Sequence, residues 1–218
     1  MNLKSLNRFL VARFKYVIFD KNIIKIKKII KNNKLNKDIY GLYPPNKFKQ
    51  SIVKMYAKRF QIDILIETGT YKGDMVIATK KLFKKIYSIE IDKHLYNLAK
   101  KRCSKYKHIF LYHGDSINIL PQILFNIKQP CLFWLDAHYS GGITSKGELE
   151  TPIMKELEII LNSSQINHVI LIDDARFFIG KHDYPTIETV KNFIRNKDND
   201  WICINKEDCI RIYKKLLY

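Results

Sequence analysis

Carboxylates follow the short apolar runs of this 218-residue sequence, at the points where strands would end. In chain order the residues in these places are Glu67, Glu90, Asp115, Asp136 with His138, and Asp173-Asp174 with Arg176. Ligands of open parallel sheets bind beyond the carboxyl ends of the strands, so these side chains should meet in one crevice. Like charges that converge in one crevice destabilise each other unless a cation is present. The pattern therefore predicts a site that holds a cation.

Three of these carboxylates could bind a metal ion. Asp136, Asp173 and Asp174 would supply hard oxygen ligands, which suit Mg²⁺, Mn²⁺ or Ca²⁺ better than zinc. The alternative for the Asp173-Asp174 pair is a turn that Arg176 neutralises through a salt bridge. The sequence leaves both interpretations open.

Residues 62–92 carry the most informative spacing. An apolar run ends in Glu67, the chain breaks at Thr68-Gly69, and a helical pattern begins after Gly73. Gly69 permits backbone angles that other residues avoid, and the start of the next helix offers free N–H groups to a ligand. Glu90, about 20 residues after the turn, occupies the place of an acid that binds ribose hydroxyls.

The spacing is E-x-G-x-x-x-G rather than the G-x-G-x-x-G of dinucleotide folds. This difference favours a ligand with adenosine and ribose but no pyrophosphate, of which S-adenosylmethionine is the common example. It argues against a nicotinamide-dependent oxidoreductase. A glycine turn in an ordinary parallel sheet is the structural alternative.

The elements that would position these residues alternate along the chain. We expect strands at 62–66, 86–89, 108–112, 130–135 and 168–172, and a closing hairpin of strands 201–205 and 209–213. We expect helices at 47–60, after Gly73, and at 94–105, 116–127, 152–162 and 185–195. The alternation predicts an α/β fold: a doubly wound, Rossmann-like, mainly parallel sheet of about seven strands, with a C-terminal antiparallel hairpin and an N-terminal helical appendage.

The net charge of +18 raises the question of a nucleic-acid partner. Lysine dominates this charge, arginine is sparse by comparison, and no motif that reads DNA or RNA is present. We interpret the charge mainly as a solvated surface, with an acidic or nucleotide-linked substrate as its functional meaning. Residues 1–45 are expected to form a basic helical arm; contact of its first 38 residues with an anionic membrane surface is the alternative.

The four cysteines form no C-x-x-C pair, and no apolar stretch reaches membrane-spanning length. A hydrophobic content of 46% supports a folded core. These features predict a protein of the reducing cytoplasm.

Five motifs carry a family resemblance: LIETGTYKGD, YSIEID, GDS, FWLDAHYSGGIT and ILIDDARFF. With them the chain resembles class I S-adenosylmethionine-dependent methyltransferases over residues 43–213, and in the last two it resembles bacterial methyltransferases encoded among surface-polysaccharide genes. The resemblance implies a methyltransferase domain at residues 46–218 that binds S-adenosylmethionine. The cofactor-binding residues it implies are Glu67, Thr68, Gly69, Gly73 and Asp74 around the methionine and ribose, Glu90 at the ribose diol, Asp115 and Ser116 at the adenine, and Asp136.

The acids after the fourth and fifth strands also resemble those of metal-dependent sugar O-methyltransferases, in which a divalent ion holds the acceptor hydroxyls. The Mg²⁺ or Mn²⁺ ligands would be Asp136, Asp173 and Asp174, although LDAHYSGG departs from the usual sequence of that family. A sugar hydroxyl is a poor nucleophile at neutral pH. His138 could accept its proton, and with Asp136 and Arg176 it forms the catalytic set that we expect.

The sequence thus predicts a methyltransferase that methylates a hydroxyl of a sugar or nucleotide-linked sugar in polysaccharide biosynthesis. Two alternatives stay open. One is an RNA methyltransferase, and the other is a non-catalytic basic module with a degenerate cofactor crevice that binds nucleic acid or a membrane surface.

Overall fold

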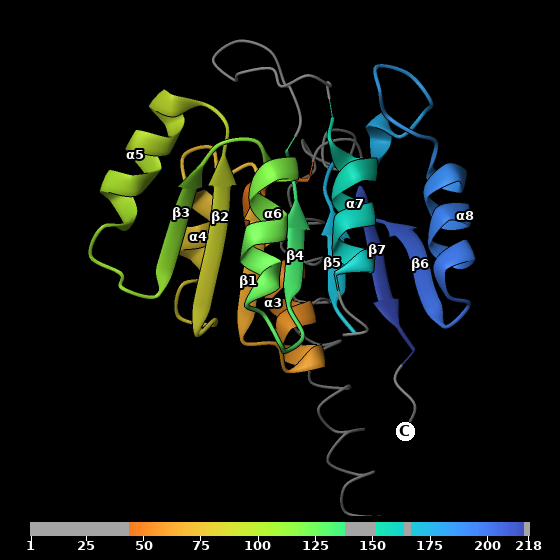
Figure 1. Ribbon diagram of the computed structural model, residues 1–218, viewed down its shortest axis with the longest axis horizontal. Helices are drawn as coiled ribbons and strands as arrows, with labels where there is room; N and C mark the ends of the chain where they lie inside the picture. The colour runs from red at the N-terminus through yellow and green to blue at the C-terminus, as the bar shows by residue number, and fades with distance from the viewer. Residues whose placement is uncertain (1–43, 138–150, 164–166, 216–218) are drawn as a thin grey trace, which may run out of the picture. The chain divides into compact units, whose positions relative to one another are not determined.

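The computed structural model describes residues 44–137, 151–163 and 167–215. Its centre is a seven-stranded sheet in the order β3-β2-β1-β4-β5-β7-β6 (Figure 1). The strands are β1 (Ile64–Thr68), β2 (Lys85–Glu90), β3 (Ile109–His113), β4 (Leu132–Leu135), β5 (Val169–Ile172), β6 (Trp201–Lys206) and β7 (Cys209–Lys214). Strands β1 to β5 are parallel, and β7 is antiparallel to both β5 and β6. The predicted mainly parallel sheet with a C-terminal antiparallel hairpin is confirmed.

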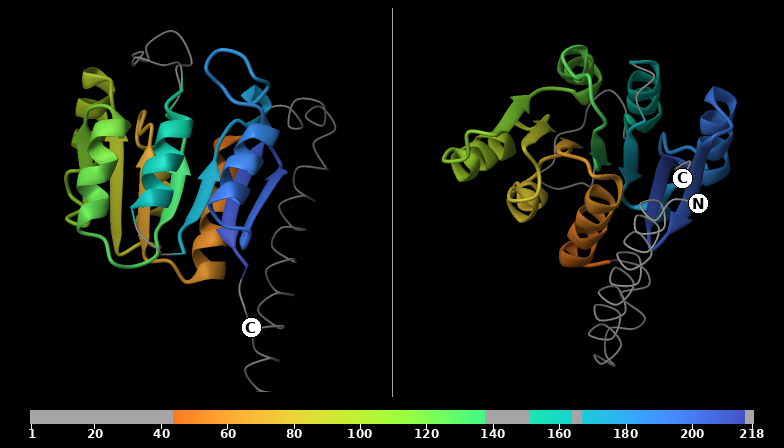
Figure 2. Two further views of the ribbon diagram at one scale, coloured as in Figure 1. Left: turned by 45° about the vertical axis from the view of Figure 1, so that its right-hand side comes forward. Right: turned by 90° about the horizontal axis from the view of Figure 1, so that it is seen from below.

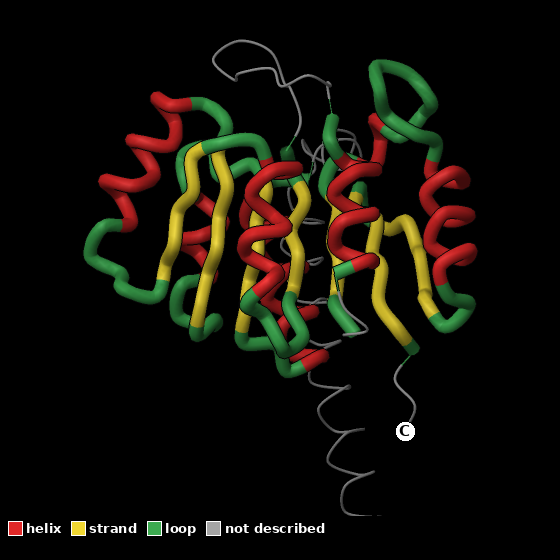
Figure 3. The backbone as a smooth tube through the Cα atoms, viewed as in Figure 1, coloured by secondary structure: helices red, strands yellow, loops and turns green. Residues whose placement is uncertain are grey.

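Helices cover both faces of this sheet, as the view from below in Figure 2 and the tube in Figure 3 show. Helices α3 and α4 lie on one face, and α6, α7 and α8 lie on the other. The helices are α3 (Asn46–Phe60), α4 (Asp74–Thr79), α5 (Lys93–Cys103), α6 (Ser116–Phe125), α7 (Ile153–Asn162) and α8 (Ile187–Lys197), with a short 3₁₀ turn, η2 (Ala175–Phe177). None of these described helices combines the length and hydropathy that a bilayer span requires.

Two apolar cores form because the central strands are buried on both faces. Along β4, Phe133 packs with α6 and α7, whereas Trp134 points into the opposite core beside α3. All four residues of β4 and all four of β5 are buried, which explains why their sequences are continuously apolar rather than alternating. The sheet therefore holds the ends of β1, β4 and β5 rigidly side by side.

Several boundaries differ from the sequence-based expectations. Strand β1 continues to Thr68, because its register with β2 extends through Glu67 and places this polar residue inside the sheet. Helix α7 begins at Ile153, so Pro152 precedes the first turn instead of forming it. The β6–β7 hairpin turns at Glu207 and Asp208, whose φ angles of 56° and 57° fit a two-residue turn without glycine. The expected basic helical arm at residues 1–45 lies outside the described residues except for Pro44 and Pro45.

Candidate cofactor and acceptor site

The turn after β1 is packed between two neighbouring strands. Gly69 has φ +86°, and a Cβ atom placed on it would lie 2.4 Å from the backbone carbonyl oxygen of Asp136, beyond the end of β4. The Gly69 and Thr70 amides both donate to the Ile89 carbonyl of β2, at 3.0 and 3.1 Å. We expected this glycine to let a ligand approach the backbone. The structure shows that a residue without Cβ is also needed here because of the nearby Asp136 backbone.

Glu90, the last residue of β2, holds this turn in place. Its carboxylate accepts hydrogen bonds from the Tyr71 amide (2.7 Å) and the Asp92 amide (2.9 Å). Burial raises the pKa of Glu90, and these backbone donors oppose the rise. A carboxylate has about four acceptor positions, so Glu90 keeps the capacity to accept from ribose hydroxyls. Its cofactor-binding role stays a prediction.

Glu67 lies inside the sheet, not at its rim. Only 2% of it is exposed, its carboxylate accepts from the Ser88 hydroxyl at 2.5 Å, and Ser88 in turn contacts the Thr70 hydroxyl. Burial raises the pKa of Glu67 well above its ordinary value; Ser88 opposes this shift, and Asp136 and Glu90 add to it. Glu67 therefore belongs to the same electrostatic cluster as the acids that end β2 and β4.

The other predicted cofactor residues border this cluster in the described structure. Asp115 caps α6 by accepting from the Ile117 amide at 2.9 Å, and Ser116 is buried in the first turn of that helix. Asp74 is half-exposed, and its carboxylate pairs with Arg102 of α5 at 2.6 Å. Gly73 has φ +76° and precedes α4, which is only six residues long.

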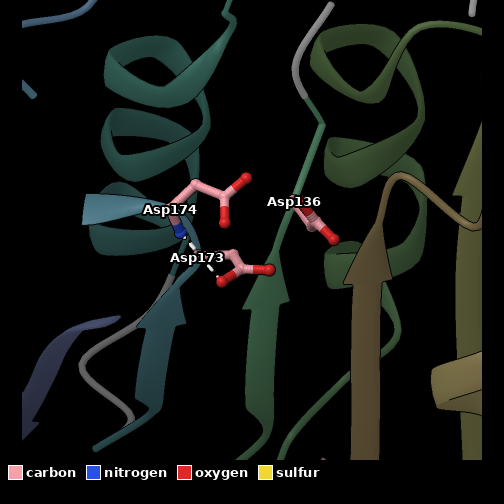
Figure 4. Close-up of side chains that lie close together, drawn as sticks. All are labelled: Asp136, Asp173 and Asp174. Atoms are coloured by element: carbon pink, nitrogen blue, oxygen red, sulfur yellow. Dashed lines mark hydrogen bonds between the residues drawn. The ribbon is translucent and has the colours of Figure 1, made fainter. Parts of the chain in front are cut away.

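The acids beyond β4 and β5 form the second part of the site. Asp136, Asp173 and Asp174 each place a carboxylate oxygen within 4.8 Å of the others (Figure 4). The Asp173 amide donates to the Leu135 carbonyl at 3.0 Å, which fixes the two strand ends together. Asp174 has φ +54°, and its amide donates to the Asp173 carboxylate at 2.8 Å. We call these three residues the acid cluster.

Two basic side chains already bind the acid cluster. Lys49 of α3 places its Nζ 2.6 Å from Asp173 Oδ2 and 2.8 Å from Asp174 Oδ1. Arg176 Nη1 lies 2.9 Å from the same Asp174 oxygen and also pairs with Asp208 at the tip of the β6–β7 hairpin. The predicted salt bridge from Arg176 to the aspartate pair is therefore present.

The electrostatics of the acid cluster follow from burial and crowding. Burial raises the pKa of Asp173 well above its ordinary value, Asp136 and Asp174 raise it further, and Lys49 opposes them. Burial lowers the pKa of Lys49, but its two carboxylate partners outweigh this effect and leave the pKa raised. The ammonium thus stays charged at neutral pH.

These contacts test whether the acid cluster fits a divalent metal ion. The three oxygens are close enough together to surround an ion. However, the Lys49 ammonium bridges the carboxylates of Asp173 and Asp174, and the guanidinium of Arg176 also binds Asp174. A divalent cation would meet strong repulsion beside these charges, so the side chains as they stand do not fit a metal, and we derive no step through one.

Sequence reasoning missed two residues at this end of the sheet. Lys49 is one lysine among many, and nothing in its local sequence distinguishes it. Glu156 lies on the buried face of α7 and is only 1% exposed. Within the described residues neither of its carboxylate oxygens has a hydrogen-bond partner, and the same is true of the Thr68 hydroxyl. The sequence did contain a signal for Glu156: it is spaced with Ile153, Leu157 and Ile160 so that all four lie on one face of the helix, and the other three are apolar.

His138, the expected base, lies outside the described residues, so its role stays a prediction. The structure brings together Glu67, Glu90, Asp136, Asp173 and Asp174, as the strand ends indicated.

No family model matches the chain. Among curated proteins, it is 25% identical over 138 residues to the ribosomal RNA small subunit methyltransferase A of Caldanaerobacter subterraneus, which covers 60% of this chain and 48% of that protein. It is 34% identical over 55 residues to an rRNA adenine N-6-methyltransferase of Escherichia coli, covering 25% of this chain and 22% of that protein. The chain thus spans less than half the length of these relatives.

Solved structures resemble the whole sheet. An O-methyltransferase from Bacillus cereus in complex with SAH has a TM-score of 0.59 and 12% identity, and covers 88% of this chain and 97% of its own. The O-methyltransferase TomG from Streptomyces achromogenes, in complex with SAM, has a TM-score of 0.57 and 16% identity, and covers 79% and 81%. A putative caffeoyl-CoA O-methyltransferase from Staphylococcus aureus has a TM-score of 0.58 and 12% identity, and covers 89% and 98%. The chain shares the Rossmann-like fold of these methyltransferases.

Proposed function

We propose that this protein is an S-adenosylmethionine-dependent methyltransferase that methylates oxygen. One observation carries the proposal: Glu90 binds the glycine turn through the Tyr71 amide, at the edge of the sheet where the acids that follow β4 and β5 converge. The solved neighbours of the same fold that contain SAM or SAH support it.

The charge of the site suits this ligand. Glu67, Glu90 and Asp136 are carboxylates beside the turn; burial raises the pKa of the first two, and Asp136 adds to the rise at Glu67. A sulfonium would add one positive charge here without needing a metal or a basic side chain. S-adenosylmethionine, when bound, supplies a methyl group on a positively charged sulfur.

We further propose that the acceptor is a hydroxyl of a small molecule, with a sugar or nucleotide-linked sugar of surface-polysaccharide synthesis as the specific class. The acid cluster supports this, because carboxylates accept hydrogen bonds from neighbouring hydroxyls and can position them for an in-line displacement. In the reaction an oxygen–carbon bond forms, the sulfur–carbon bond breaks, and the hydroxyl proton passes to a base. His138 remains the proposed base.

A second candidate is methylation of RNA. The curated relatives named above are rRNA methyltransferases, and the net charge of +18 would attract a polyanion. The converging carboxylates argue for the small-molecule acceptor, because they would repel phosphates brought close to the reacting atoms.

A methyl-transfer assay separates these candidates. The purified full-length protein would be incubated with methyl-labelled S-adenosylmethionine and, in parallel, with nucleotide sugars, polysaccharide fragments and ribosomal RNA. We expect label in a sugar acceptor, and a loss of about 100-fold or more in Asp136→Asn. Asp63→Asn is the matched control. Asp63 directly precedes β1 and forms an exposed ion pair with Lys84. Label confined to RNA would establish the second candidate and refute the first.

A further inference from the structure

Lys49 stands out among the basic residues of the chain by its position. It lies in the first turn of α3, and its side chain is 17% exposed. The helix is fixed to the sheet by Ile52, Val53 and Tyr56, all of which are buried in the core beside β1 and β4. The packing of α3 against the sheet therefore fixes the position of Lys49 next to the aspartates.

The Lys49 ammonium binds two of the three carboxylates that a metal ion would need. It bridges Asp173 Oδ2 and Asp174 Oδ1 at 2.6 and 2.8 Å, and these are charge-assisted hydrogen bonds of good length. Both aspartates are nearly fully buried, at 4% and 6% exposure. Buried carboxylates need a positively charged partner, and Lys49 provides one as a side chain of the protein and not as a dissociable ion.

Two positive charges already lie against the acid cluster. The Lys49 ammonium binds Asp173 and Asp174, and the Arg176 guanidinium binds Asp174. A divalent cation held by the same carboxylates would lie beside both positive charges and would be repelled by them.

We propose that Lys49 is the resident cation of this site: its ammonium occupies the position of a divalent metal ion and makes the protein metal-independent. The ammonium has three N–H groups, of which the aspartates take two. The third has no hydrogen-bond acceptor among residues 44–137, 151–163 and 167–215, and it can donate to an acceptor hydroxyl. The donation to an acceptor hydroxyl rests on the proposed methyl transfer. The occupation of the metal position by Lys49 does not depend on that function.

The experiment measures Mn²⁺ binding by electron paramagnetic resonance, in which bound and free Mn²⁺ give different signals. The wild-type protein, Lys49→Met, Lys49→Arg and the control Lys47→Met would each be titrated with Mn²⁺ alone. Lys47 lies on the same helix and is exposed, so its substitution removes one charge without touching the acids. Thermal melting and SAH binding of each variant report on the fold and on the cofactor site.

We expect no saturable Mn²⁺ site in the wild-type protein, in Lys49→Arg or in Lys47→Met. Lys49→Met should gain one site, with affinity at least about 10-fold above the wild type because the like charge is gone. Adding Asp174→Asn to Lys49→Met should abolish this gained site and so place it at the acid cluster.

A saturable Mn²⁺ site in the wild-type protein would overturn the proposal, and this measurement needs no variant. A folded Lys49→Met that gains no site would also overturn it, since the ammonium would then not occupy a metal position. If SAH still binds in either case, the proposed methyltransferase function stands and only the role of Lys49 is lost.

Discussion

The carbonyl oxygen of Asp136 lies directly against Gly69, so that a Cβ atom on this glycine would come within 2.4 Å of it. This contact joins the turn that we assign to the cofactor with the strand end that we assign to the acceptor. The two halves of the site are therefore one rigid unit, and a change at Gly69 should affect both.

Gly69→Ala should destabilise the protein by about 3 kcal/mol or more, because it combines a backbone clash with an unfavourable positive φ. Gly73→Ala is the matched control: its φ is also positive, at +76°, but its Cβ would make ordinary contacts of 3.7 Å or more. It should lose only about 1–2 kcal/mol. Urea denaturation measures both, and equal losses would show that the Asp136 contact is unimportant.

Glu156 should make stability depend on pH. Burial raises its pKa from the ordinary value of 4.5 to about 7. Between these two values the unfolded chain releases the proton while the folded protein keeps it. The free energy of unfolding must therefore fall as pH rises through this window.

Glu156→Gln keeps the shape and removes the titration. The variant should match the wild type near pH 4.5 and exceed it by up to about 3 kcal/mol at pH 8, because folding raises the pKa of Glu156 from 4.5 to about 7. Denaturation at several pH values tests this, with Glu158→Gln as the control because Glu158 is exposed on the same helix. A stability difference that does not change with pH would contradict the assignment.

Cofactor binding should also depend on pH, through the sulfonium charge. Burial raises the pKa of Glu67 and of Glu90, so their ionised forms, which attract a cation, become populated at higher pH than in an exposed carboxylate. S-adenosylmethionine should therefore gain affinity relative to S-adenosylhomocysteine, whose sulfur is neutral, as pH rises through the range in which these groups titrate, by up to about 10-fold per pH unit. Calorimetry with both ligands measures the ratio. Glu67→Gln should flatten it, and a constant ratio in the wild type would remove these carboxylates from contact with the sulfonium.

Arg176 should couple the β6–β7 hairpin to the end of β5. Its guanidinium pairs with Asp174 and Asp208, and its amide donates to the Asp208 carboxylate at 2.8 Å. Arg176→Met leaves two buried carboxylates without this partner and should cost about 3 kcal/mol. A double-mutant cycle with Asp208→Asn should give a coupling of about 1 kcal/mol or more. If the stability losses of the two single variants simply add in the double variant, the Arg176–Asp208 ion pair contributes nothing to stability.

Much of this architecture could be predicted from local pattern alone. The runs that became β4 and β5 are continuously apolar because both faces of those strands are buried, and this is visible without any structure. The carboxylates after parallel strands had to meet at one edge once the sheet order was known. Asp136, Asp173 and Asp174 do meet there.

The remaining features depend on contacts between distant segments. Lys49 reaches acids more than 120 positions away, and its own neighbourhood is ordinary lysine-rich helix. The burial of Glu67 follows from the β1–β2 register and from Ser88, which no spacing rule connects to it. The turn at Glu207 and Asp208 lacks the usual glycine, and its two carboxylates pair with Arg211 and Arg176.

The most direct test of the central claim is calorimetric titration of S-adenosylmethionine into the purified protein. We predict saturable binding in the micromolar range that is lost in Glu90→Ala, because this substitution removes the carboxylate that holds the Tyr71 amide and the turn. Wild-type protein that binds neither S-adenosylmethionine nor S-adenosylhomocysteine would contradict the account.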